Sequence, residues 1–278
     1  MLLTTVFVAL LSFTTTVLGA VVQPRAAAVL DPSKVKPKAP KKVPTHNQDD
    51  IVPWVGAVIM KPPANTIFTA VSAKLTVPNP RIPKGMPSGQ EYGAAAWVGI
   101  DGANSPIMLQ AGVNFHIDSK GVPQFNASDP PFSSLRKHTN HRASTQWLPG
   151  QAASSEIEGF AVHAGDVIYI SVSSPDGKTG TVVINNETTG QKFNQPLTAP
   201  KDSILPGMNA DWIVEQYGYT GEGLTPVADF GSVAFTEAKA STEDGRVVGP
   251  QDGGEIVSHA QKLRGEIRPG NVAVTFAG

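Results

Sequence analysis

The chain contains no cysteine among its 278 residues. This absence excludes a disulfide framework, a thiol nucleophile and zinc held by cysteine thiolates. It does not exclude secretion, because a chain of this length can bury a core that needs no covalent cross-links. Burial and hydrogen bonding must therefore hold the fold together.

Long hydrophobic runs are also lacking beyond the first twenty residues, which read MLLTTVFVALLSFTTTVLGA. This run ends in the small residues Gly19 and Ala20, which is typical of a secretory signal peptide. A transmembrane anchor is the alternative, but three consecutive threonines and the proline-rich segment that follows disfavour it. We therefore expect residues 1–20 to be a signal peptide and the mature protein to be extracellular, with no membrane association.

The sequence has no large excess of charge of either sign, since its net charge is −1. This value is not basic enough for a nucleic-acid-binding protein. Residues 21–50 nevertheless hold six basic and three acidic residues, a net +3, whereas residues 51–278 hold 16 basic and 20 acidic residues, a net −4. The basic segment is rich in Lys and Pro and cannot bury a core. It is either a linker or a propeptide that neutralises the body, and the secretory context favours a propeptide over residues 21–50.

Several hydrolase motifs are missing. The sequence has no Gly-x-Ser-x-Gly, no His-Glu-x-x-His, and no Asp-Thr-Gly or Asp-Ser-Gly. These absences argue against a serine nucleophile elbow, a zinc-protease helix and the usual frame of an aspartic-protease dyad. His138 and His141 stand in a polar stretch, where solvated histidines are commoner than metal ligands. We expect neither a metal nor an organic cofactor.

The part that remains, residues 51–278, is rich in turn residues and short alternating segments. The chain has 27 Gly and 24 Pro, and no ten-residue stretch shows a clean helical period. Many short strands without crossover helices predict an all-β sandwich or barrel. We treat residues 51–278 as one domain.

Two polar side chains interrupt apolar strands of this domain. Between Ala94 and Val113 the sequence alternates in a way that places Gln110 on the face opposite to the aliphatic residues. Glu215 lies in a second apolar strand, Ala210-Asp-Trp-Ile-Val-Glu215. Gln110 either satisfies buried backbone groups or faces a cleft, and Glu215 is either a solvated edge residue or a partly buried acid suited to proton transfer. We expect the two side chains to meet.

The sequence resembles the eqolisins, the glutamic peptidases of fungi, through short matches that follow the family's order across residues 51–278. The matching stretches are 54–57, 68–73, 96–102 (AWVGIDG), 109–112 (LQAG), 146–149, 165–168, 186–192, 210–215 (ADWIVE) and 230–233. The resemblance implies a sandwich of two curved antiparallel sheets, similar to concanavalin. It also implies a secreted proenzyme with a basic propeptide and endopeptidase activity at acid pH.

The same resemblance assigns Gln110 and Glu215 as the catalytic dyad. In this assignment Glu215 activates water as general base, and Gln110 holds that water and stabilises the oxyanion. Supporting or substrate-binding roles fall to Trp54, Trp97, Asp101, Gln146, Trp147 and Leu148. The alternative for Trp97 and Asp101 is a purely structural role in the core or in a turn. Pro53, Gln146 and Leu148 depart from the family, which usually has Asn at the first position and Glu and Tyr at the other two. We expect these departures to alter subsite specificity.

Two Asn-x-Ser/Thr sequons, at Asn126 and Asn186, fall in expected loops and are candidate glycosylation sites. The expected partners are protein or peptide substrates and the chain's own propeptide, and the expected state is a monomer. The alternatives to a peptidase are a non-catalytic β-sandwich binding module and a degenerate peptidase without turnover.

Overall fold

The computed structural model describes residues 54–124, 142–148, 155–157, 159–216, 218–219, 223–258, 260 and 262–278. The expected signal peptide, the expected propeptide, Pro53, Asn126, His138 and His141 lie outside these ranges. Every regular element within them is a β-strand. No helix in these ranges is long and apolar enough to cross a membrane.

The first sheet, here called sheet I, carries the residues singled out from the sequence. It has eight antiparallel strands in the order β16-β1-β11-β3-β4-β6-β7, with β5 paired to β4. Its strands are β1 (Trp54–Ile59), β3 (Tyr92–Asp101), β4 (Met108–Ile117), β5 (Pro123–Gln124), β6 (Arg142–Leu148), β7 (Ser155–Glu156), β11 (Ala210–Glu215) and β16 (Gly254–Ser258). Strand β11 enters between β1 and β3, so a late segment of the chain lies beside the β3–β4 hairpin.

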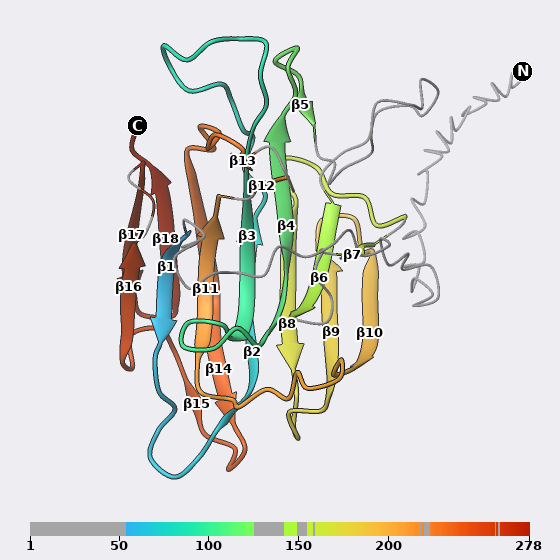
Figure 1. Cartoon of the computed structure of the whole chain (residues 1–278), viewed down its shortest axis with the longest axis vertical. Helices are drawn as coiled ribbons and strands as arrows, with labels where there is room; N and C mark the ends of the chain where they lie inside the picture. Colours follow the sequence, from blue (N-terminus) through green and yellow to red (C-terminus); the bar gives the residue numbers. More distant parts are fainter. Residues whose placement is uncertain are drawn as a thin grey trace, which may run out of the picture.

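The second sheet, sheet II, packs against sheet I. Its eight antiparallel strands run in the order β10-β9-β8-β2-β14-β18-β17, with β15 paired to β14. They are β2 (Phe68–Thr76), β8 (Val167–Ser173), β9 (Thr179–Asn186), β10 (Lys192–Thr198), β14 (Ser232–Thr242), β15 (Val247–Val248), β17 (Leu263–Arg268) and β18 (Asn271–Phe276). A separate pair joins β12 (Gly218–Tyr219) to β13 (Gly223–Leu224). Figure 1 shows the strands of both sheets running along the long axis of the molecule. The expected all-β sandwich of two antiparallel sheets is confirmed.

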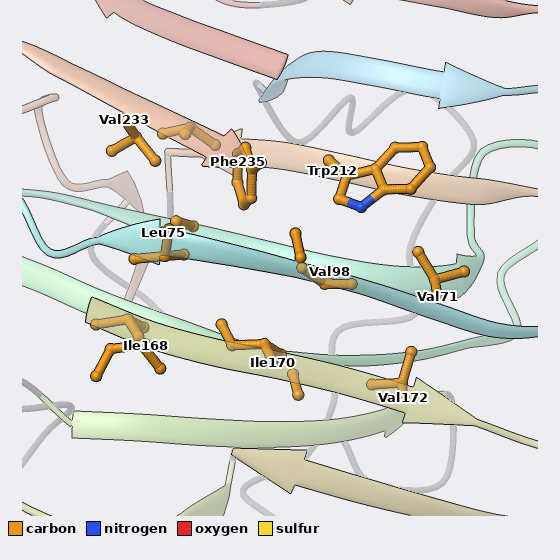
Figure 2. Close-up of a cluster of buried hydrophobic side chains, with 14 of the residues drawn as sticks. Val71, Leu75, Val98, Ile168, Ile170, Val172, Trp212, Val233 and Phe235 are labelled. Atoms are coloured by element: carbon orange, nitrogen blue, oxygen red, sulfur yellow. The ribbon is translucent and has the colours of Figure 1, made fainter. Parts of the chain in front are cut away.

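The core lies between the sheets and follows from the period of two in the sequence. Alternate residues of β3 and β4, such as Val98, Ile100 and Leu109, are fully buried in one large cluster. Figure 2 shows Val98 and Trp212 from sheet I beside Val71, Leu75 and Ile170 from sheet II. The indole Nε1 of Trp212 donates a hydrogen bond to the carbonyl of Ser72, 3.0 Å away, which ties the two sheets together. Because the apolar face of sheet I packs against sheet II, the polar residues of sheet I lie on its other face.

The opposite face of β3, which carries Trp97, is also buried. All ten residues of β3 are buried. On this second face, Val58, Ala95, Trp97 and Ile213 form a small apolar cluster, against which Trp54 packs. This cluster is the floor on which the candidate site is built.

Candidate active site

The polar face of sheet I brings together residues from five neighbouring strands. Register pairs Trp54 with Glu215 and Glu215 with Ala95, so Trp54 and Glu215 share this face. It also pairs Gly99 with Gln110 and Gln110 with Gln146. Side chains of directly paired residues point to the same side of a sheet. The predicted site residues on this face are Trp54, Trp97, Asp101, Gln110, Gln146, Leu148 and Glu215.

Gln110 is the third residue of β4 and is only 5% exposed. Its Nε2 atom donates a hydrogen bond to Oε1 of Gln146 on β6, 2.8 Å away. The Gln110 amide therefore bonds to a side chain and not to buried backbone groups. Gln110 also lies on the polar face of sheet I. One N–H of Gln110 remains for another acceptor, since a primary amide has two.

Glu215 ends β11 and is partly exposed. Burial of its carboxyl group raises its pKa to about 7, from a usual value of 4.5. The indole N–H of Trp97 on β3 acts in the opposite direction and lowers this pKa. Nε1 of Trp97 is buried, yet it makes no hydrogen bond of good geometry within the described ranges. Burial is therefore the dominant influence on the pKa of Glu215, and the nearby indole N–H of Trp97 is a weaker one.

Gln110 and Glu215 share one face of one sheet but are not directly paired. Glu215 is opposite Ala95, which pairs with Asn114, whereas Gln110 lies four residues before Asn114 on β4. Strand spacing and rise place their Cα atoms roughly 10 Å apart across the sheet and roughly 13 Å apart along it. The two side chains make no hydrogen bond to each other; the Gln110 amide donates to Gln146 instead. Any joint action on a peptide bond must therefore occur across the space between them.

Trp97 and Gly112 form the floor of that space. The two residues are paired between β3 and β4. A Cβ atom on Gly112 would lie 2.5 Å from Cε3 of Trp97, so only glycine lets the indole ring cover this part of β4. The ring lies between the rows of Glu215 and Gln110. Trp97 therefore lies between the two residues of the expected dyad.

Asp101 anchors a loop rather than pointing into open space. Its carboxyl oxygens accept hydrogen bonds from the backbone N–H groups of Gly207, Met208 and Asn209, at 2.8, 2.6 and 3.1 Å. Burial raises the pKa of Asp101, and these three backbone donors act against the rise. The anchored segment runs directly into β11, so Asp101 helps to set the position of Glu215.

Trp147, expected in a supporting or substrate-binding role, does not lie on the polar face with Gln146 and Leu148. Trp147 pairs with Leu109 on the core side of sheet I, and it is 1% exposed. Its Nε1 donates to the carbonyl of Ser203, 2.9 Å away. Alternation along β6 requires this outcome, because Gln146 and Leu148 face the polar side and the residue between them must face the core. Leu148 is partly buried opposite Met108.

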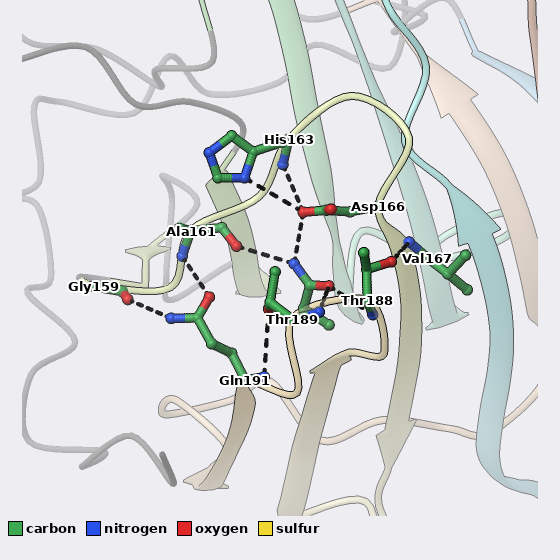
Figure 3. A network of polar contacts seen from close by, with 9 residues as sticks. Gly159, Ala161, His163, Asp166, Val167, Thr188, Thr189 and Gln191 are labelled. Carbon is green, nitrogen blue, oxygen red and sulfur yellow. Dashed lines mark hydrogen bonds and ion pairs between the residues drawn. The ribbon is translucent and has the colours of Figure 1, made fainter. Parts of the chain in front are cut away.

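A glycan on Asn186 does not fit the folded chain. Asn186 is 0% exposed, and its Nδ2 atom donates to Oδ2 of Asp166 at 2.7 Å and to the carbonyl of Ala161 at 3.2 Å. Figure 3 shows the network around Asp166 and Gln191, on the loop beside β8 and β9. The expected loop is the turn between β9 and β10, and Oδ1 of Asn186 accepts hydrogen bonds from the backbone N–H groups of Thr188 and Thr189 within it. The other candidate, Asn126, lies outside the described residues.

Sequence reasoning missed Asp211, a buried carboxyl on the same face as Glu215. Asp211 is 5% exposed and pairs with Gly99, the partner of Gln110. Burial, followed by the negative charges of Asp101 and Glu215, raises its pKa well above the usual range. The spacing of four residues along one strand, between Asp211 and Glu215, would have predicted a shared face. In the described ranges no group of three or more acidic or histidine side chains is arranged to hold a metal ion.

Comparison with known proteins gives consistent matches. A family model described as Peptidase A4 family matches residues 52–268. Aspergillopepsin-2 of Aspergillus niger is 30% identical over 223 residues, which cover 75% of this chain and 70% of that protein. The crystal structure of aspergilloglutamic peptidase from Aspergillus niger matches with a TM-score of 0.54 and 29% identity, over 66% of this chain and 99% of that one. Scytalido-glutamic peptidase, solved with a peptide-based transition-state analog, matches with a TM-score of 0.60 over 81% of this chain and 98% of that one. Its identity of 23% makes it a likeness of fold.

Proposed function

This chain belongs to the Peptidase A4 family and is a glutamic-type endopeptidase, and on that premise we propose that it cleaves peptide bonds at acid pH through Gln110 and Glu215. One observation carries the proposal: a carboxyl group with a raised pKa shares the polar face of sheet I with a buried, oriented amide. The space between the two rows is floored by Trp97 and Gly112. A substrate carbonyl placed there lies between a proton-transfer group and a hydrogen-bond donor.

Gln110 supplies the donor for the carbonyl oxygen. One N–H of its amide is held by Gln146, and the other is available to an oxygen that gains negative charge as water attacks. A fixed donor aimed at the developing oxyanion stabilises the transition state more than the ground state. The hydrogen bond to Gln146 limits the amide to a narrow range of orientations.

Glu215 supplies the proton transfers. With a pKa of about 7 it carries its proton at acid pH, and a protonated carboxyl both donates and accepts. Water attacks the carbonyl carbon and passes a proton to the free oxygen of Glu215, while the O–H of Glu215 protonates the carbonyl oxygen, giving a neutral diol. In the second step Glu215 protonates the leaving nitrogen and takes a proton from the diol as the C–N bond breaks. The Glu215 carboxyl thus returns to its protonated starting state. At acid pH this scheme replaces the role of an ionised general base, because Glu215 carries its proton there.

The test is hydrolysis of a denatured protein and of a fluorogenic peptide by purified variants. Glu215→Gln keeps the size of the side chain but cannot relay protons, so we expect turnover to fall at least ~1000-fold. Gln110→Ala removes one oxyanion donor, for which ~100- to 1000-fold is typical. Leu224→Ala, at an exposed position, is the control. A folded Glu215→Gln protein with full activity would refute the dyad, and an inactive wild type would indicate a binding module or a degenerate peptidase.

We also propose that residues 1–20 direct secretion and that residues 21–50 act as an inhibitory propeptide. The apolar run ending in Gly19 and Ala20 supports the first statement. The net +3 of residues 21–50, against the net −4 of residues 51–278, supports the second. Electrostatic attraction between the two parts weakens when acid protonates carboxylates of the body.

A further inference from the structure

The carboxyl residue directly across the sheet from Gln110 is Asp211, not Glu215. Asp211 pairs with Gly99, and Gly99 pairs with Gln110, so the three stand in one row on neighbouring strands. Two strand spacings, roughly 10 Å, separate the Cα atoms of Asp211 and Gln110, with no offset along the strands. Asp211 is therefore better placed than Glu215 to act on the Gln110 side chain.

The side chain of Asp211 leans toward Gln110 because Gly99 leaves the way open. A Cβ atom on Gly99 would lie 2.7 Å from Oδ1 and 2.9 Å from Oδ2 of Asp211. Both carboxyl oxygens therefore lie over Gly99 of β3, the strand between β11 and β4. This position covers about half of the gap between the two strands, and the Gln110 amide on the other side of that gap is bonded to Gln146 on β6.

The hydrogen-bonding needs of the two side chains are complementary. Nε2 of Gln110 donates to Gln146, whereas Oε1 of Gln110 accepts no hydrogen bond in the described part of the chain. The Asp211 side chain likewise has no hydrogen-bond partner among the described residues, although it is only 5% exposed. A protonated carboxyl has one O–H to donate, and Oε1 of Gln110 is an acceptor.

The surroundings keep Asp211 in the donor form. Burial is the main cause of its raised pKa, and the charges of Asp101 on β3 and Glu215 on β11 add to it. The residues that pair with Asp211 on β1 and β3 are Val58 and Gly99, so neither directly paired strand offers a positive charge. Gln110 and Gln146, which complete the row, are neutral.

We propose that Asp211 is a positioning residue, which donates a hydrogen bond to Oε1 of Gln110 in the substrate complex and so holds the amide N–H toward the scissile carbonyl. Catalytic hydrogen bonds of this kind are often long in the free enzyme and shorten when substrate binds. Asp211 transfers no proton to the substrate in this scheme. The inference rests on the proposed role of Gln110 as the oxyanion donor.

The test is a double-mutant cycle between positions 211 and 110. Asp211→Ala should lower kcat about 10-fold with little change in KM, because an amide that is less well oriented stabilises the transition state less. Asp211→Asn keeps a donor and should recover most of the lost kcat. In a Gln110→Ala background, Asp211→Ala should have no further effect. Equal losses in both backgrounds would overturn the proposal, as would an Asp211→Asn variant as inactive as Glu215→Gln.

Gly99→Ala provides an independent route to the same result. Its methyl group would push the Asp211 carboxyl aside, so kcat should fall in the wild-type background and not in Asp211→Ala. A loss of the same size in both would overturn the proposal, and this variant also serves if Asp211→Ala does not fold. Melting temperatures monitor folding throughout. If Gln110→Ala and Glu215→Gln keep full activity, the dyad itself has failed, whereas an inactive Gln110→Ala with an additive cycle contradicts only the role of Asp211.

Discussion

At the scale of single residues, the proposed mechanism depends on the protonation state of Glu215. A carboxyl group on an open strand edge would be ionised at pH 5, but burial raises the pKa of Glu215 to about 7. Trp97 opposes this rise without cancelling it. The surroundings of Glu215, rather than its residue type, therefore suit it to the acid–base role that we propose for it at acid pH.

The pH dependence of the rate tests this assignment. The active form carries the proton, so kcat/KM should be high below the pKa and fall as pH rises through about 7. Initial rates with a fluorogenic peptide between pH 3 and pH 9, with folding checked at each pH, measure the profile. A rate that instead rises through pH 7 would show that Glu215 starts as an ionised general base.

At the scale of elements, the end of β3 and the start of β11 are joined through one side chain. Asp101 has a φ of 65°, which a non-glycine residue seldom adopts and which Asp tolerates better than most. In this conformation it accepts the three backbone hydrogen bonds of residues 207–209. The two strands that carry Trp97 and Glu215 are thereby held in register at one end.

Replacing Asp101 should affect both stability and turnover. Asp101→Ala leaves three backbone N–H groups without their acceptor, and we expect it to lower the free energy of unfolding by roughly 3 kcal/mol or more. We also expect at least a tenfold loss of kcat. Asp101→Asn keeps one acceptor oxygen and should show smaller losses of both. Denaturant unfolding and peptide hydrolysis measure them.

Asp176 offers a matched control for this experiment. Its carboxyl accepts hydrogen bonds from the backbone N–H groups of Lys178 and Thr179, as that of Asp101 does from residues 207–209, but in an exposed turn of sheet II. Asp176→Ala should lower stability only slightly and leave kcat unchanged. If Asp101→Ala behaves in the same way, Asp101 does not position β11.

At the scale of the whole molecule, the buried carboxyls should make the protein more stable in acid than at neutral pH. Asp101, Asp211 and Glu215 all have raised pKa values. The folded state therefore binds more protons than the unfolded state, and stability falls as pH rises through the raised values. For Glu215 alone, the loss between its usual pKa of 4.5 and about 7 is on the order of 3 kcal/mol.

The buried His116 has the opposite effect on the pH dependence of stability. This effect determines the pH range in which the carboxyls can be tested by melting temperature. Burial lowers the pKa of His116 to about 4, so its contribution to stability is lost as pH falls from 6.5 toward 4. Above pH 6.5 only the carboxyls contribute among these groups. We therefore expect the melting temperature to fall between pH 6.5 and pH 8, and to fall less in Glu215→Gln. A melting temperature that rises across this window would contradict the raised pKa values.

The proposed propeptide also belongs to this scale. We expect the active secreted protein to lack residues 21–50, and acid to promote their release, because attraction between a +3 segment and a −4 body weakens as carboxylates are protonated. Intact-mass measurement and N-terminal sequencing of the active form test this directly. Active protein that retains Lys34 through Lys42 would exclude an inhibitory role. A peptide of residues 21–50 should inhibit the active form more strongly at pH 7 than at pH 4.

The sequence by itself determined the fold class and the face on which each strand residue lies. Alternation with a period of two fixes that Gln110 leaves the core and Leu109 enters it. The same rule applied to β6 places Trp147 in the core. Trp147 was nevertheless included among the expected site residues together with its neighbour Gln146.

Only the tertiary structure decided which strands are neighbours. Nothing in the local sequence states that β11 lies between β1 and β3, and this insertion sets Asp211 opposite Gly99 and Trp54 opposite Glu215. The buried state of Asn186, and the pKa values of Glu215 and Asp211, follow from such long-range packing. Burial and proximity depend on where distant segments meet, whereas local pattern records only the preferences of each segment.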